Sequence, residues 1–102
     1  MARKNKVIPP IHPGETLAED FLKPLGLSAN RLAIELLVPV TRINDIVRGK
    51  RSITADTALR LARYFGTTPR FWMYLQANFD LETAQDARGP EIAGRIRPLQ
   101  AA

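Results

Sequence analysis

Apolar side chains recur every three or four residues along most of this chain, a period typical of α-helices with one buried face. Glycine, proline and helix-capping residues divide the pattern into segments. The five predicted helices are residues 13–24, 29–36, 39–48, 55–65 and 69–88. No alternating apolar and polar run of the kind that predicts a strand competes with them. The pattern therefore predicts an all-α domain with a longer C-terminal helix.

The same pattern assigns the core and the ends of the domain. The positions expected inside are Leu17, Phe21, Leu22, Leu32, Ala33, Leu36, Ile43, Ile46, Ala58, Leu59, Leu61, Ala62, Phe65, Phe71 and Leu75. Tyr64 and Tyr74 also occupy core-like positions. Gly89 and Pro90 are expected to end the last helix, which leaves residues 89–102 as a flexible tail and residues 1–12 as an extended arm before a domain of residues 13–88.

Two helices joined by a link of about three residues lie between Leu32 and Arg51. Ile43 and Ile46 are three residues apart and share a face, which would pin the second helix against the first. Ala33 is small where the two helices cross. The side chains left facing outward are Val40, Thr41, Asn44, Asp45 and Arg48. This arrangement predicts a helix-turn-helix, whose second helix (the recognition helix) suits a DNA major groove.

The outward residues have the chemistry of base recognition. Asn44 can pair with adenine and Arg48 with guanine, while the methyl groups of Val40 and Thr41 can contact a thymine methyl. Hydroxyl, amide and basic side chains near helix N-termini flank this strip and suit DNA phosphates. The expected phosphate contacts are Ser28, Asn30, Arg42, Lys50, Arg51 and Ser52. The alternative is that all these side chains form an ordinary solvated face.

Charge and composition support a binding protein over an enzyme. The net charge is +5, and six basic residues against two acidic ones lie between Thr41 and Arg63, which favours an anionic partner. The chain has no cysteine and one histidine, so thiolate metal sites and cysteine nucleophiles are excluded, and no metal or cofactor is expected. His12 lacks the neighbours of a catalytic base, and we expect it to fix the start of the first helix. No run is apolar and long enough to span a bilayer, so we expect a cytoplasmic protein.

Three stretches carry a family resemblance in their order and spacing. They are HPGETLAEDFLKPLGLS (His12–Ser28), LAIELLVPVTRINDIVRGKRSIT (Leu32–Thr54) and ALRLARYFGTTPRFWMYLQANFDLETA (Ala58–Ala84). The chain resembles the Xre/Cro-type helix-turn-helix family, and within it the HigA-type antitoxins of bacterial toxin–antitoxin modules. The resemblance implies a lambda-repressor-like fold and a dimer that represses its own operon and neutralises a RelE-like mRNA-cleaving toxin. The alternative is a stand-alone Xre-family transcriptional regulator without a toxin partner.

The resemblance also assigns roles to residues. It maps the recognition helix onto Val40–Arg48 and implies base contacts by Thr41 and Asn44 first. One departure concerns the turn, because the family usually has Gly where Leu37 stands, and Leu there either costs about 1 kcal/mol in a left-handed conformation or alters the turn. Pro39 also replaces the family's Ser or Thr.

Three further groups of side chains have an expected binding role: two aromatic residues, an acidic stretch and a basic N-terminal stretch. Trp72 and Phe79 are expected to divide their surface between the core and a two-fold dimer contact. The acidic residues Asp80, Glu82, Asp86 and Glu91 face either a basic toxin or only solvent. The basic residues Arg3, Lys4 and Lys6 either reach into a minor groove or only add solubility.

Overall fold

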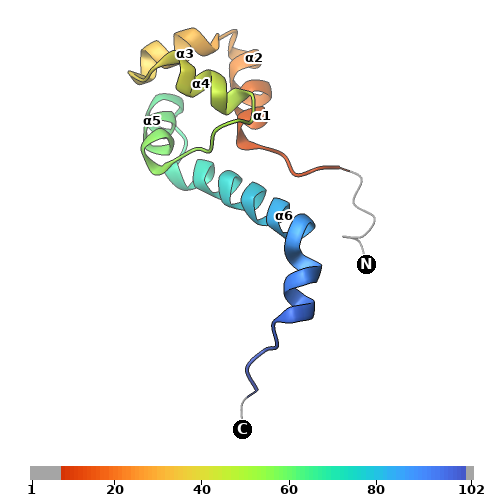
Figure 1. Cartoon of the computed structure of the whole chain (residues 1–102). Coiled ribbons are helices and arrows are strands. Elements are labelled where there is room, and N and C mark those ends of the chain that lie inside the picture. The colour runs from red at the N-terminus through yellow and green to blue at the C-terminus, as the bar shows by residue number, and fades with distance from the viewer. Residues whose placement is uncertain (1–7, 101–102) are drawn as a thin grey trace.

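The computed structural model describes residues 8–100, so the predicted roles of Arg3, Lys4 and Lys6 lie outside the described residues. Within residues 8–100 the regular structure is helical throughout. In chain order the elements are α1 (Pro13–Thr16), η2 (Leu17–Leu22), α2 (Lys23–Leu25), α3 (Ala29–Leu36), α4 (Val40–Val47), α5 (Ala55–Phe65) and α6 (Pro69–Arg95). The first three follow one another without a break, so the described residues form five helical rods (Figure 1). The all-α prediction is confirmed.

The helix starts lie where capping chemistry predicts them. In each case a side chain accepts a hydrogen bond from a backbone N–H two or three residues ahead, at 2.8 to 3.5 Å, which satisfies a donor that the helix leaves unpaired. The capping residues are His12, Ser28, Thr54 and Thr68. The expected role of His12 is thus confirmed, since its Nδ1 accepts from the Gly14 N–H.

The first helix does not end at Pro24. Its middle, η2, is π-helical, and the N–H of Lys23 reaches back five residues to the carbonyl of Ala18. A wider turn of this kind gives room where the Pro24 ring would otherwise meet the preceding turn. The helix ends instead at Gly26, which takes the left-handed conformation with φ 62°.

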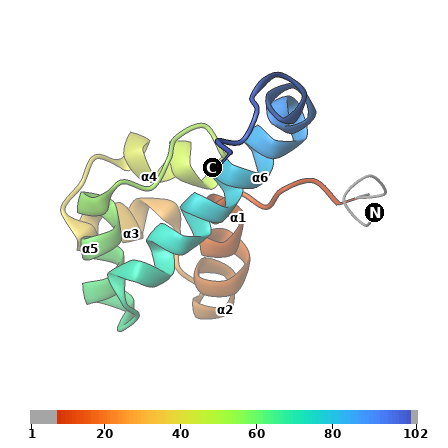
Figure 2. The same ribbon diagram turned by 90° about the horizontal axis from the view of Figure 1, so that it is seen from below.

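One hydrophobic core holds the helices together, and Figure 2 shows α6 running across the underside of the other helices. The buried apolar side chains are Leu17, Leu22, Leu32, Ala33, Leu36, Ile43, Ile46, Ile53, Ala58, Leu61, Ala62 and Trp72. Trp72 is completely buried and its indole N–H donates to the Thr67 hydroxyl at 2.7 Å. The expectation that Trp72 shares its surface with a partner is therefore wrong, because the core encloses the whole side chain.

Three side chains that were expected in the core lie outside it. Leu59 is 59% exposed, and Tyr64 and Tyr74 are 42% and 64% exposed. Leu59 and Tyr64 line an open hollow of about 560 Å³ between α5 and the end of α3. Periodicity assigned these residues to the core, but burial depends on where the neighbouring helices end.

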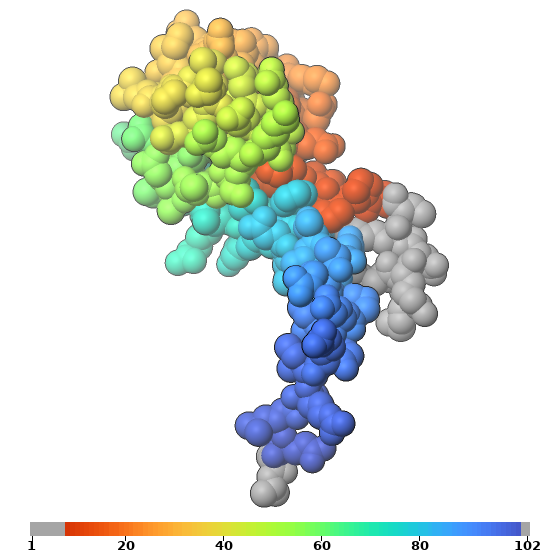
Figure 3. Space-filling model, in the orientation of Figure 1, coloured from red at the N-terminus to blue at the C-terminus, as the bar shows by residue number. Residues whose placement is uncertain are grey.

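The last helix is longer than expected. α6 continues through Gly89 and Pro90 to Arg95, so the prediction that these two residues end it is wrong. A proline inside a helix removes one backbone hydrogen bond and bends the helix, but the turns after it can remain helical. Glu91 pairs with Arg88 at 2.9 Å and with Arg95 at 3.9 Å across these turns. Figure 3 shows this end of α6 projecting from the body of the molecule.

No helix in residues 8–100 combines the length and the apolar character needed to cross a membrane.

The position of α4 depends on a close backbone contact with α1. Gly14 is buried at the start of α1, and a Cβ built on it would overlap the carbonyl oxygen of Ile46 in α4. Only a residue without a side chain permits this approach. Gly14 therefore fixes how closely the first helix packs on the recognition helix.

We expect Gly14→Ala to lower the free energy of unfolding by about 1–3 kcal/mol, because the added methyl group forces α1 and α4 apart. Urea denaturation measures this change. The control is Gly94→Ala, where nothing lies within 4 Å of the new Cβ, so that substitution should be neutral or slightly stabilising. Equal stability of Gly14→Ala and the wild type would show that the two helices do not need this contact.

Candidate nucleic-acid interface

Helices α3 and α4 form the expected helix-turn-helix. Ile43 and Ile46 are fully buried and Ala33 is almost so, as the spacing predicted. The turn between the helices is closed by the Val38 N–H, which donates to the Ala33 carbonyl at 3.1 Å. The buried face of α4 is thus committed to the core, and its opposite face is left for a ligand.

Leu37 takes the left-handed conformation at this turn, with φ 61°. It is the one non-glycine residue with positive φ among residues 8–100, and its side chain is 83% exposed. The turn therefore keeps the geometry that the family's glycine provides, at a cost of about 1 kcal/mol for the crowded Cβ. The replacement of glycine by Leu37 therefore strains one residue and leaves the turn unchanged.

The outward side chains of α4 form a continuous strip. Val40, Thr41 and Arg48 are exposed, and Asn44 is partly exposed between them. Within residues 8–100, no side-chain hydrogen bond or ion pair occupies the Asn44 amide or the Arg48 guanidinium. These two groups keep their full capacity to bind base edges.

A short loop of residues 48–54 carries basic side chains away from the end of α4. The N–H groups of Gly49 and Lys50 donate to the carbonyls of Ile46 and Asp45 at 3.0 and 2.8 Å. The Arg51 guanidinium lies 3.6 Å from the Asp45 carboxylate. The loop is therefore ordered by its own hydrogen bonds before any ligand binds.

This loop and α5 line an open hollow of about 250 Å³ at the N-terminus of α5. Its lining residues are Arg42, Arg51, Ser52, Thr54, Asp56 and Thr57. It brings together three of the six predicted phosphate contacts at a helix terminus whose dipole favours an anion. Ser28 and Asn30 do not join this group and lie exposed at the start of α3.

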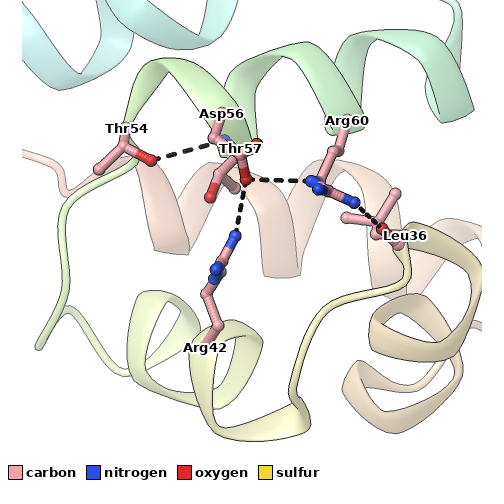
Figure 4. Close-up of polar contacts among 6 residues, drawn as sticks. All are labelled: Leu36, Arg42, Thr54, Asp56, Thr57 and Arg60. Carbon is pink, nitrogen blue, oxygen red and sulfur yellow. Dashed lines mark hydrogen bonds and ion pairs between the residues drawn. The ribbon is translucent and has the colours of Figure 1, made fainter.

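Asp56 is the centre of a polar junction within the same region (Figure 4). Its Oδ2 accepts from Arg42 at 2.8 Å and from Arg60 at 3.0 Å, and Arg60 also donates to the Leu36 carbonyl at the end of α3 at 2.8 Å. The hydrogen bonds from Arg60 and Arg42 hold the pKa of Asp56 below its usual range. One carboxylate thereby connects α3, α4 and α5.

The junction changes the interpretation of Arg42. The sequence placed this residue among the phosphate contacts, but its guanidinium is already bonded to Asp56 and is only 29% exposed. It lines the hollow without pointing freely into solvent. Arg51 and Lys50 are the more accessible cations of the predicted set.

Gln76 and its neighbours are structural features that the sequence analysis missed. Gln76 is 4% exposed on α6, and its Oε1 accepts from the backbone N–H of Ile53 at 2.8 Å. Its Nε2 donates to Asp80 at 2.9 Å. A signal was present, since Gln76 follows Trp72 by four residues and so lies on the same buried face of the helix.

His12 lies close to the same loop. Its ring meets the edge of Phe79 with centroids 4.8 Å apart. Burial lowers the pKa of His12, while Asp80 and a hydrogen bond to the backbone of Arg51 act in the opposite direction. A neutral ring is required for its cap, because Nδ1 must accept from the Gly14 N–H.

Comparison with known proteins agrees with this geometry. The helix-turn-helix family model matches residues 19–72. Virulence-associated protein I of Dichelobacter nodosus is 56% identical over 84 residues, which cover 82% of this chain and 77% of that protein.

Two solved structures are also similar. A HigA-family addiction module antidote protein from Coxiella burnetii superposes with a TM-score of 0.86 at 49% identity, covering 90% of this chain and 100% of that one. The Pseudomonas aeruginosa antitoxin HigA, solved with the higBA promoter, superposes with a TM-score of 0.87 at 48% identity, covering 89% and 99%. The fold, the helix-turn-helix geometry and the sequence identity all agree with these relatives. The chain therefore belongs to the HigA-type antitoxins of the helix-turn-helix family.

Proposed function

We propose that this protein is a DNA-binding antitoxin that represses its own operon by placing α4 in the major groove of operator DNA. The observation that carries this proposal is the outward strip of α4, on a helix that α1 and α3 hold in place. Arg51 and Ser52, at the edge of the hollow beside α5, add groups that can bind a phosphate next to this strip. The Pseudomonas relative solved with its promoter supports the same use of the fold.

The contacts divide into two kinds. Thr41 and Asn44, with Val40 and Arg48, are proposed to read base edges, because their polar groups and methyl groups face outward. The proposed phosphate contacts are Ser28, Asn30, Arg42, Lys50, Arg51 and Ser52, of which Arg42 is the least accessible because it is bonded to Asp56. The protein has no catalytic role in this proposal, in keeping with a family of DNA-binding antitoxins and regulators.

We expect Asn44→Ala to weaken binding to the preferred DNA sequence by about 1–3 kcal/mol and to relax the preference at one base position. Arg51→Ala should weaken binding to all sequences alike and reduce the salt dependence. Selection from a random duplex library, followed by affinity measurements at several salt concentrations, separates the two effects.

The controls are Thr83→Ala and Arg97→Ala, since both residues are exposed away from the strip, Thr83 on the side of α6 opposite Tyr74 and Leu81, and Arg97 after the end of α6. Both variants should bind as the wild type does. If Asn44→Ala keeps the sequence preference of the wild type, α4 is not the recognition helix.

We further propose that the protein acts as a dimer formed through α6. Phe79 is half-buried and keeps part of its surface for a partner. Tyr74 and Leu81 are 64% and 70% exposed two turns apart on one face of α6, where a second copy would cover them. Operator half-sites about one DNA turn apart require two paired recognition helices.

We expect Leu81→Glu to convert a dimer into a monomer, because the pairing would bury a charge without a partner. Light scattering at micromolar concentration gives the mass. Leu25→Glu on α2, where the leucine is 63% exposed, is the control and should leave the mass unchanged. A wild-type mass of one chain contradicts the dimer.

Neutralisation of a RelE-like mRNA-cleaving toxin is proposed from membership in the HigA-type antitoxins. The acidic stretch of α6 is a weak candidate for the toxin surface, since Asp80, Glu82, Asp86 and Glu91 all have interactions within the chain. This favours the interpretation of these four residues as a solvated helix face.

We expect this chain to copurify with the product of a toxin-like reading frame directly upstream of its gene and to relieve the growth arrest which that product causes. Asn44→Ala should neutralise the toxin as well as the wild type does, because the substitution affects DNA binding alone. If the two products do not associate, the stand-alone regulator is the better description.

A further inference from the structure

The loop after the recognition helix is held at two points, one near each end. At its start the N–H groups of Gly49 and Lys50 are bonded to carbonyls of α4. At its end the Ile53 N–H is bonded to Gln76 of α6, and the Ile53 side chain is buried. Arg51 and Ser52 therefore bridge two fixed points, and their position depends on both.

The Gln76 amide has one orientation that satisfies its surroundings. The Asp80 carboxylate only accepts hydrogen bonds, so the NH2 group of Gln76 must face it. The Oε1 atom is thereby directed at the Ile53 N–H. Because this group is buried, the hydrogen bond is strong and leaving its donor unpaired is unfavourable.

His12 supports the same loop from the N-terminal side. A Cβ on Gly49 would lie 3.7 Å from Cγ of His12, so the ring lies against the turn at the start of the loop. Phe79 of α6 also packs against the His12 ring, with the ring centroids 4.8 Å apart. The inner surface of the loop is thus formed by α6 and by the residue that caps α1.

We propose that Gln76 is a positioning residue for DNA binding, through which α6 sets where Lys50 and Arg51 meet the phosphate backbone. The inference rests on the proposed function and deepens it. Gln76 touches no DNA itself and acts through the backbone of Ile53. Any change that displaces α6 from the body of the domain would then also release the phosphate-binding loop.

The test compares Gln76→Met with the wild type on two probes, a duplex selected by this chain from a random library and a 30-base-pair duplex of random sequence. Methionine has a similar length and volume, but its thioether sulfur is only a weak acceptor for the Ile53 N–H. We expect binding to both duplexes to weaken about tenfold, and the slope of log affinity against log salt to fall by about one, as for one lost phosphate contact. The ratio of the two affinities should stay within about threefold.

Gln100→Met makes the same change at an exposed position after the end of α6 and is the matched control. It should leave the affinities and the salt slope unchanged. Faster hydrogen exchange of the Ile53 amide in Gln76→Met would report release of the loop directly. A folded Gln76→Met protein with the wild-type salt slope and affinities would overturn the proposal and leave Gln76 a purely structural residue.

A second variant separates loss of this hydrogen bond from loss of folding. Gln76→Glu alone places two carboxylates side by side and should fail like Gln76→Met. Combined with Asp80→Asn, it restores both hydrogen bonds, because Glu accepts from the Ile53 N–H and from the Asn amide. We expect the double variant to return to within about threefold of wild-type affinity with the wild-type salt slope.

The outcomes separate this proposal from the proposed function. If the folded double variant remains as weak as Gln76→Glu, the positioning role is overturned while DNA binding stands. If the wild-type protein enriches no sequence from the library and does not bind the random duplex, the proposed function itself fails.

Discussion

The contact between the Gly14 backbone and the Ile46 carbonyl is the constraint on which the candidate interface depends. A helix carried only by side-chain packing would have some freedom to shift, but here two backbones meet with no side chain between them. His12 caps the same turn of α1 and so holds the glycine in place. The recognition helix is thus positioned by the rigid start of another helix as well as by its own buried isoleucines.

Polar contacts then attach the edges of α4 to the rest of the domain. Asp56 connects Arg42 of α4 to α5, and Arg60 extends this connection to the end of α3. On the other side, the loop after α4 is bonded to Gln76 of α6. Among the polar side chains from Val40 to Arg48, Arg42 and Asp45 have such contacts, whereas Thr41, Asn44 and Arg48 have none within residues 8–100. Packing and polar contacts together define which surface is left for a ligand.

The helices and their starts were predictable because they depend on neighbours close in the sequence. A capping hydroxyl at Ser28, Thr54 or Thr68 bonds to a residue three positions ahead, and the buried pair on α4 follows from helical spacing. The local rule for proline was misleading at Pro24 and Pro90. In both places the helix continues past the proline ring. A wider turn makes room for the ring at Pro24, and Pro90 lies within a long helix that has ion pairs between its turns.

The sequence by itself determined the helical pattern, the buried face of α4 and therefore the residues on its outward strip. Those features follow from a period of 3.6 residues and from the burial of apolar groups. Only the tertiary structure decided that Arg42 is bound to Asp56, that Trp72 is enclosed, and that Gln76 holds the loop beside the recognition helix. The two pairings join residues 14 and 23 positions apart, and the enclosure of Trp72 depends on which helices meet. The spacing of residues in one helix carries no information about which side chain of another helix will face it.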